Sequence, residues 1–468
     1  MNLGTVNVSF FQELLNTIAD RGRALLEGSS AAGPGSALTE LARGLLSGRG
    51  EASGVALAGE ILSAYRRADE AGKLEFFRFL LNDLTPDSEK VTAAARAYLD
   101  GASQTTLSEL EMAVESPRQE FFRRLNLAPG ATVCIVAMRA DLIAMLPKVP
   151  ELRLVDADLM HLLGSWFNRG FLVLRRIDWS TSASILEKII EYEAVHEIRG
   201  WEDLRRRLDP ADRRCFGFFH PSLVDEPLIF VEVALTGEVP ASIQDLLAAQ
   251  IAQDSDAQAP TTAVFYSISN CQEGLRGISF GNFLIKQVAE DLAKEMPSLK
   301  TFVTLSPAPR FAAWLVRAAS EDGEQLDVET LALLEEPSWA AHAEYHERLE
   351  SVLMPLAAEY FMIAKTGNGS PVDPVARFHL GNGARLERIN WLGDKSARGL
   401  RQSHGIMVNY LYDLNDIEKN HEAYVNMGKI AASKAVRSLV RSSARTKLNN
   451  KKRKEADMSA NATDAADE

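Results

Sequence analysis

Residues Tyr266 to Pro309 read YSISNCQEGLRGISFGNFLIKQVAEDLAKEMPSLKTFVTLSPAP, and this stretch decides the fold. Its first strand begins just before it, because residues 261–269 form the apolar, β-branched run that is typical of a buried strand. Residues 282–296 then place apolar side chains at helical spacing, and Pro297 ends that run. Residues 299–305 form a second short apolar run. The stretch therefore predicts a strand–helix–strand unit.

The connection between the first strand and the helix is a candidate anion-binding loop. It covers Arg276–Asn282 and opens directly onto the helix. Such a loop aims backbone N–H groups and the positive end of the helix dipole at an anion. Ser306 follows the second strand, and ligands of open α/β sheets bind beyond the carboxyl ends of such strands. We therefore expect a binding site at this end of the unit.

The composition bounds the class of protein. The chain has 468 residues, of which 46% are hydrophobic and 25% charged. These values are typical of a soluble globular protein with roughly two to three domains. The net charge of −13 argues against a nucleic-acid-binding or membrane-surface protein, since those partners attract cationic surfaces. The sequence has no apolar run of about 18 residues and no signal-peptide pattern, so we expect a cytoplasmic protein.

Three cysteines stand far apart in the sequence, at Cys134, Cys215 and Cys271. Their positions match neither a CxxC motif nor a disulfide framework. This pattern is typical of a reducing compartment and predicts no structural zinc site.

Two domains and a tail are expected. Residues 1–165 read as helix after helix, with predicted helix starts at the capping boxes Ser9-x-x-Gln12 and Thr106-x-x-Glu109 and at Ser116-Pro117. This all-α domain carries no catalytic or metal motif, and we expect a scaffold or oligomerisation role. Residues 446–468 combine a basic run with acidic residues at the chain end, which predicts a disordered charged tail.

Residues 166–445 alternate between strand-like and helix-like runs, which predicts a mixed-sheet domain of the α/β or α+β class. Strands are also expected at 171–174, 216–220, 228–235, 384–392 and 406–412, and helices at 183–192, 311–319, 340–363 and 417–440.

The loop sequence is close to the (Gln/Arg)-x-x-Gly-x-(Gly/Ala) signature of GNAT acetyltransferases, whose loop amides hold the pyrophosphate of CoA. Here it reads Arg276-x-x-Ser279-x-Gly281, so that Ser279 replaces the first glycine. A plain strand-to-helix turn is the alternative interpretation of the same pattern.

Histidines offer two further candidates. His342 and His346 stand four residues apart, but Glu344 between them lies on the opposite side of a helix, so we interpret this as a helix surface and not as a zinc site. His379 lies just before the strand-like run at 384–392. By itself it has the alternative interpretation of an exposed loop histidine, and pairing it with Ser306 is weakly supported by the motifs alone.

Several segments together resemble the malonyl-CoA decarboxylase family. They are Tyr266–Ser269, Gly274–Gly277, Gly281–Lys286, Leu305–Pro309, Trp314–Leu315, Phe378–Gly383, Arg388–Trp391 and Gly405–Tyr412, in the same order and at similar spacing. The resemblance is specific over residues 170–433 and looser over the helical part. The segment between Trp314 and His379 is shorter than in animal members.

The resemblance implies a helical N-terminal domain, a GNAT-like catalytic domain and a homotetramer. Carried over by motif, Ser306 and His379 match the catalytic serine and histidine, while Ser267 and Tyr412 match further active-site positions. The matching CoA-binding loop consists of Arg276, Gly277, Ile278, Ser279, Phe280, Gly281 and Asn282. Animal members carry a glutamate where this chain has Ser279, which leaves the role of Ser279 open.

The implied activity is a carboxy-lyase reaction of fatty acid metabolism, from malonyl-CoA to acetyl-CoA and CO₂. Loss of CO₂ leaves a thioester enolate, which needs hydrogen-bond donors and a proton for C2 but no metal, biotin or pyridoxal cofactor. In the implied assignment His379 supplies that proton and Ser306 acts as proton acceptor or relay. Which of the two contacts the carboxylate or the carbonyl stays open.

Two other functions remain as alternatives. The loop signature also fits a CoA-dependent acyltransferase of the GNAT type. A helical assembly protein that binds acyl-CoA without turnover is the third possibility, although the catalytic-type motifs argue against it.

Overall fold

The computed structural model describes residues 34–47, 50–248, 259–278, 284–322, 328–336 and 338–441. The chain divides into two compact units. The first unit consists of Met1–Leu174, Phe218–Ile229 and Asn270–Gly281, and the second of Arg175–Gly217, Phe230–Ser269 and Asn282–Glu468. The expected tail at 446–468 and the capping box at Ser9 lie outside the described residues. The domain boundary near residue 165 stays a prediction.

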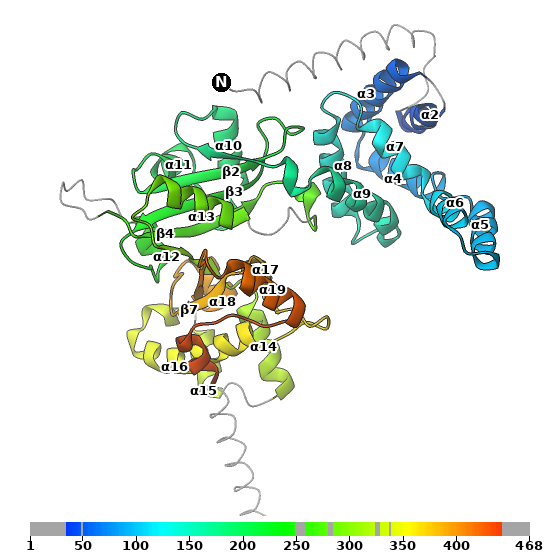
Figure 1. Cartoon of the computed structure of the whole chain (residues 1–468). Coiled ribbons are helices and arrows are strands. Elements are labelled where there is room, and N and C mark those ends of the chain that lie inside the picture. Colours follow the sequence, from blue (N-terminus) through cyan, green and yellow to red (C-terminus); the bar gives the residue numbers. More distant parts are fainter. Residues whose placement is uncertain are drawn as a thin grey trace, which may run out of the picture. The chain divides into compact units, whose positions relative to one another are not determined.

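Helices build most of the first unit, as the sequence predicts. They are α2 (Pro34–Leu46), α3 (Glu51–Arg67), α4 (Glu70–Asn82), α5 (Ser88–Asp100), α6 (Gln104–Val114), α7 (Pro117–Leu125), α8 (Ala131–Met145) and α9 (Arg153–Trp166), shown from blue to teal in Figure 1. Their core contains edge-to-face ring pairs: the centroids of Phe76 and Phe121 lie 6.0 Å apart and those of Phe121 and Phe122 lie 5.4 Å apart. Helices α5 and α6 pack on each other and contain no buried residue.

Two predicted helix starts in this unit have different outcomes. The capping box is formed by Ser103 and Thr106, not by Thr106 and Glu109, because α6 already begins at Gln104. Ser116 does stand at the N-cap before Pro117. Its hydroxyl donates to Asp158 at 2.8 Å instead of capping the helix.

The described residues form one eight-stranded sheet in the order β1-β2-β3-β4-β5-β8-β6, with β7 also pairing with β8. The strands are β1 (Val173–Ile177), β2 (Arg213–Phe219), β3 (Pro227–Thr236), β4 (Thr262–Asn270), β5 (Thr301–Thr304), β6 (Ser306–Pro307), β7 (Arg385–Asn390) and β8 (Met407–Leu411). Because β4 and β5 run parallel while β5, β6 and β7 run antiparallel to β8, the sheet is mixed. The predicted order of a helical region followed by a mixed-sheet domain is confirmed.

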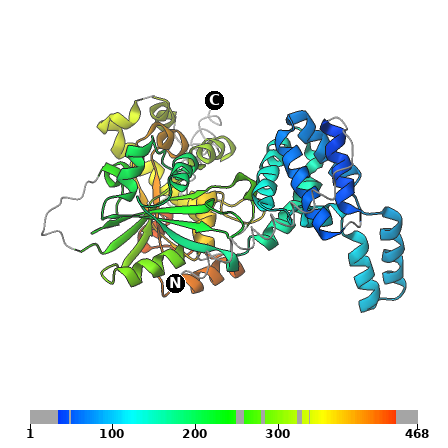
Figure 2. The same cartoon turned by 90° about the horizontal axis from the view of Figure 1, so that it is seen from above.

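Helices lie on both faces of the sheet (Figure 2). The helices of the second unit are α10 (Ala183–Tyr192), α11 (Trp201–Leu208), α12 (Ile243–Ala248), α13 (Leu284–Glu295), α14 (Phe311–Asp322), α15 (Val328–Glu335), α16 (Ala343–Met362), α17 (Pro374–Gly381), α18 (Ala397–Ser403) and α19 (Ile417–Met427). On one face, Val264, Tyr266 and Val303 join a buried apolar cluster with residues of α12. The alternate residues of the same strands point to the other face.

The parallel pairing of β4 with β5 ends before either segment reaches its serine. Its last paired residues are Phe265 and Thr304, and the N–H of Leu305 donates to the carbonyl of Phe265 at 3.0 Å. From Ser306 onward the chain pairs with β8 instead. Ser306 lies two residues beyond Thr304, so it follows the alternation of the face opposite the α12 cluster.

Two predicted elements are wrong in detail. His379 lies within α17, not in a loop before a strand, because Asp373 caps a helix that begins with Pro374. The long helix expected over 417–440 ends at Met427, where Gly428 adopts the left-handed conformation (φ 63°) that terminates helices.

Candidate active site

The hydroxyl of Ser306 is held at the start of β6 between two polar side chains. Ser306 Oγ donates to Thr304 Oγ1 at 2.9 Å and lies 3.0 Å from His379 Nε2. Ser306 is 5% exposed and His379 is 2% exposed. The structure thus brings together the serine and histidine that the sequence separates by 73 residues.

The other ring nitrogen of His379 meets Tyr412. Nδ1 lies 2.8 Å from the Tyr412 hydroxyl, which stands directly after β8. The ring of Tyr410 stacks on the imidazole, with centroids 4.6 Å apart and an interplanar angle of 24°. Ser306, His379 and Tyr412 therefore form one continuous chain of hydrogen bonds.

Burial keeps this chain neutral. It lowers the pKa of His379 to about 3, because the imidazolium would lose its hydration. Burial also raises the pKa of Tyr412 well above its ordinary value. A neutral imidazole carries one N–H and one lone pair, so it can pass a proton between Ser306 and Tyr412.

Helix α17 is held so that His379 reaches the sheet. The Asp373 carboxylate accepts from the N–H of Ala376 at 2.8 Å and from the hydroxyl of Tyr360 at 3.0 Å. After the helix, Gly383 has φ 81°, and an added Cβ would lie 2.1 Å from the carbonyl oxygen of Ile417. The polypeptide can turn toward β7 here only with glycine.

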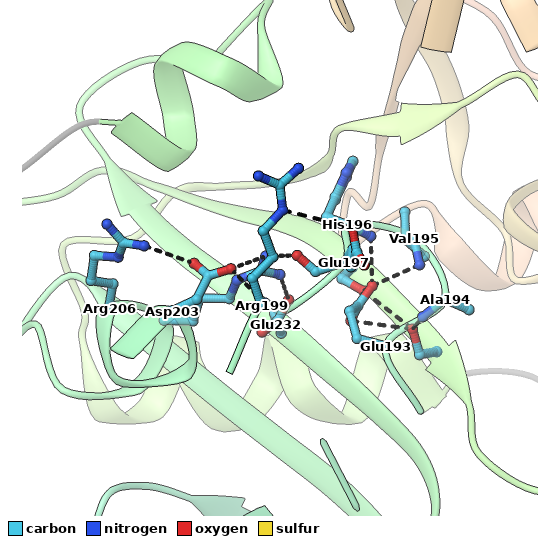
Figure 3. Close-up of polar contacts among 12 residues, drawn as sticks. Glu193, Ala194, Val195, His196, Glu197, Arg199, Asp203, Arg206 and Glu232 are labelled. Carbon is cyan, nitrogen blue, oxygen red and sulfur yellow. Dashed lines mark hydrogen bonds and ion pairs between the residues drawn. The ribbon is translucent and has the colours of Figure 1, made fainter. Parts of the chain in front are cut away.

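Ser267, further along β4, has a different partner. Its Oγ donates to both carboxylate oxygens of Glu193, at 2.9 and 2.7 Å. Glu193 Oε1 also accepts the backbone N–H groups of Val195 and His196, each at 2.7 Å (Figure 3). No hydrogen bond among the described residues joins Ser267 to Ser306, His379 or Tyr412.

A buried ion pair lies near Glu193. Arg207 donates to Glu232 at 3.2 Å, and Glu232 is fully buried. Burial raises the pKa of Glu232 to about 8, an effect that nearby Glu193 reinforces and Arg207 opposes. Glu193 and Glu232 appear together in Figure 3. Neither carboxylate lies in a motif of the sequence.

The beginning of the predicted CoA-binding loop lies in the first unit, where α8 holds it. Arg139, which is 2% exposed, donates to the carbonyls of Gly274 and Arg276 at 2.7 and 2.9 Å. Its Nε donates to Asp156 at 2.7 Å. Gly274 approaches α8 so closely that an added Cβ would lie 1.8 Å from the carbonyl oxygen of Val136. Main-chain anchoring by a buried arginine thus sets the start of the loop.

The rest of that loop, Ser279 to Asn282, lies outside the described residues. Arg276 and Gly277 are exposed and Ile278 is half-buried. The described part of the chain contains no group of three or more histidine, cysteine or acidic side chains placed to bind a metal ion. None of its helices is long and apolar enough to cross a membrane.

Sequence reasoning missed several residues of these sites. Thr304 lies in no motif, and Tyr410 lies in a segment of the family resemblance without an assigned role; the register of β5 and β8 brings them to Ser306 and His379. Arg139 and Glu193 act on segments far away in the sequence. Alternation along β5 was the one available signal, since Thr304 and Ser306 are two residues apart.

The two units, the mixed sheet and the buried serine–histidine–tyrosine chain define an enzyme whose site can transfer protons. Residues 84–167 match the malonyl-CoA decarboxylase N-terminal domain, and residues 170–451 match the malonyl-CoA decarboxylase C-terminal domain. The chain belongs to the malonyl-CoA decarboxylase family.

Individual relatives agree with this membership. The chain is 37% identical over 413 residues to the mitochondrial malonyl-CoA decarboxylase of Anser anser anser, covering 80% of this chain and 82% of the goose protein. The crystal structure of malonyl-CoA decarboxylase from Rhodopseudomonas palustris has a TM-score of 0.81 and 55% identity, and covers 86% of this chain and 99% of that one. The corresponding structure from Agrobacterium vitis has a TM-score of 0.79 and 53% identity, with the same coverage of 86% and 99%.

Proposed function

We propose that this protein is a carboxy-lyase that converts malonyl-CoA to acetyl-CoA and CO₂. The observation that carries the proposal is the hydrogen-bond chain from Ser306 through His379 to Tyr412, found in a member of this family. Decarboxylation leaves an enolate that must receive one proton at C2. A buried, neutral chain of three proton-carrying groups suits that task, because it excludes water and offers a proton beside the reacting carbon.

Ser306 and His379 are the proposed catalytic residues. Tyr412 donates to or accepts from the far side of the imidazole and holds its orientation. Stacking of Tyr410 on the same ring limits rotation of the imidazole. These two contacts hold the imidazole ring of His379 in one orientation before substrate binds, which lowers the entropic cost of the proton transfer.

The proposed substrate site extends beyond these residues. Arg276 to Asn282 bind the CoA pyrophosphate through backbone N–H groups, and Ser267 contacts the substrate. The reaction uses no cofactor, since the thioester carbonyl itself accepts the electrons released with CO₂. We further propose a cytoplasmic homotetramer that acts in fatty acid metabolism.

An assay without an acyl acceptor tests the proposed function. The purified full chain is incubated with malonyl-CoA alone, and acetyl-CoA and CO₂ are quantified. The proposal expects both products in equal amounts. Unchanged malonyl-CoA would overturn it and would direct attention to an acyl acceptor.

A further inference from the structure

The donors and acceptors around Ser306 determine which way each hydrogen of the hydrogen-bond chain points. A serine hydroxyl has one hydrogen and two lone pairs. The hydrogen of Ser306 is directed at Thr304 Oγ1, 2.9 Å away. Toward His379 Nε2, at 3.0 Å, Ser306 can then present only a lone pair. His379 must therefore donate its Nε2–H to Ser306.

The protonation of Nε2 also determines the direction of the hydrogen bond between His379 and Tyr412. A neutral imidazole that carries its hydrogen on Nε2 has a lone pair on Nδ1. Nδ1 therefore accepts the hydrogen of the Tyr412 hydroxyl, 2.8 Å away. All three hydrogens point the same way, from Tyr412 through His379 and Ser306 to Thr304.

Thr304 is fixed as the acceptor at the end of this chain. Its Oγ1 also accepts the backbone N–H of Tyr410 at 3.1 Å, and a backbone N–H can only donate. The carbonyl of Thr304 accepts from the side chain of Asn409 at 2.7 Å. Thr304 is fully buried. Contacts from β8 thus fix the position of Thr304, and its hydroxyl oxygen has a second lone pair for the hydrogen of Ser306.

We propose that Thr304 is a positioning residue, which takes the hydrogen of Ser306 and thereby selects the His379 tautomer protonated on Nε2. Without this acceptor, Ser306 would donate to His379, and the imidazole would carry its hydrogen on Nδ1 and donate to Tyr412. The hydrogens would then point away from the reacting carbon. Thr304 sets the direction in which the site delivers protons.

The consequence for the reaction rests on the proposed function. When the bond between C2 and the carboxylate carbon breaks, its electron pair enters the thioester enolate and CO₂ leaves. The Ser306 hydroxyl turns to give its proton to C2, the Nε2 proton of His379 replaces it, and the Tyr412 proton moves to Nδ1. Negative charge rests on the Tyr412 oxygen until product leaves. The protons of the hydrogen-bond chain then move back toward Tyr412, and Ser306 takes one proton from water.

NMR of the full chain labelled with ¹⁵N-histidine tests the tautomer without any substrate. One-bond coupling to hydrogen identifies the protonated ring nitrogen, and loss of the signal in His379→Asn assigns it. Wild type is expected to carry the hydrogen on Nε2 of His379, and Thr304→Val on Nδ1. Hydrogen on Nδ1 in wild type overturns the proposal, whether or not the variants fold.

Kinetics with malonyl-CoA provide the second test. Thr304→Val, which keeps the shape and removes the acceptor, is expected to lower kcat about tenfold, at the lower end of general acid–base effects. Thr304→Ser keeps the hydroxyl and should have a kcat close to that of wild type. Thr301→Val makes the same change on the same strand outside the hydrogen-bond chain and should leave kcat unchanged.

A double variant separates a directional role from a structural one. Tyr412→Phe should lower kcat in wild type, because it removes the first donor of the chain. In the Thr304→Val background it should add less than about a twofold loss, since Tyr412 is no longer the donor there. Fully additive losses, or an unchanged His379 tautomer in Thr304→Val, would overturn the proposal. Absence of decarboxylation in wild type would instead overturn the proposed function and leave the tautomer result standing.

Discussion

Arg139 and His379 are both almost fully buried, yet they meet burial in opposite ways. The guanidinium of Arg139 donates to Asp156 and to two backbone carbonyls, which replace its hydration. His379 loses its charge, because only hydroxyl groups meet its ring nitrogens and burial lowers its pKa to about 3. The charged group fixes the course of the main chain, and the neutral group fixes the positions of protons. In this protein, the buried charged side chain of Arg139 anchors the main chain, and the buried neutral side chain of His379 is placed for proton transfer.

The largest expected effect on activity comes from interrupting the neutral hydrogen-bond chain of Ser306, His379 and Tyr412. Ser306→Ala and His379→Asn should each lower kcat by about 10²-fold or more, the magnitude of lost general acid–base catalysis. Circular dichroism should show an intact fold. Near-wild-type turnover in both variants would remove these residues from the chemistry.

Breaking the charged anchor should act on binding instead. Arg139→Met leaves two carbonyls and Asp156 without their donor, so it should lower the free energy of unfolding by about 3 kcal/mol. Because the released carbonyls begin the proposed CoA-binding loop, KM for malonyl-CoA should rise roughly tenfold while kcat changes less. Steady-state kinetics and denaturant unfolding measure the two effects.

Arg118 provides a matched control for Arg139. It is also buried, and it donates to Asp158 and to the carbonyls of Leu80 and Leu81, which belong to α4 and not to the loop. Arg118→Met should therefore destabilise the protein by a similar amount and leave KM unchanged. An equal rise of KM in both variants would mean that Arg139 acts through stability alone.

Gly274→Ala should give a smaller change in the same direction. The new Cβ would collide with the carbonyl of Val136, so the loop must move away from α8. Because relief of this clash takes a movement of about 1 Å or more while Arg139 still anchors the loop, we expect KM for malonyl-CoA to rise about fivefold, less than in Arg139→Met. Gly237→Ala, where a Cβ meets no atom within 4 Å, serves as the control.

The smallest expected effect is a flat pH profile. Since the pKa of His379 is about 3, its imidazole stays neutral far below the ordinary value of about 6.5. We expect kcat to show no inflection between about pH 8 and pH 5.5. An apparent pKa near 6.5 that disappears in His379→Asn would contradict the neutral chain.

The same shift predicts the sign of the effect of pH on stability. Between about pH 6.5 and 3, the unfolded chain binds a proton at His379 that the native chain does not bind. The contribution of His379 to stability therefore falls as pH falls through this range. His379→Asn should flatten that part of the unfolding curve.

Much of the fold could be predicted because its determinants are local. The run at 261–269 gave β4, and the spacing over 282–296 gave α13. Short elements with weak periodicity are harder to predict: α17 has eight residues, about two turns, which is too few to show a clear helical spacing. Gly428 was overlooked inside an otherwise helical pattern.

The candidate site was predictable only in part, because its contacts are long-range. Ser306 and His379 were paired by family resemblance, since no local pattern links two side chains 73 residues apart. Glu193 holds Ser267 across 74 residues. Thr304 depends on the hydrogen-bond register with β8, which a single sequence does not specify. Position within the sheet, more than residue type, assigns these groups their roles.

The hairpin of α5 and α6 has a consequence for the dynamics of the molecule. Because neither helix buries a side chain in the core, opening the hairpin exposes little apolar surface beyond its own. Its amide protons should exchange with solvent through local opening, long before those of α7 or α8 exchange through global unfolding. Residues 88–114 thus form a separate unit of cooperativity within the helical part of the chain.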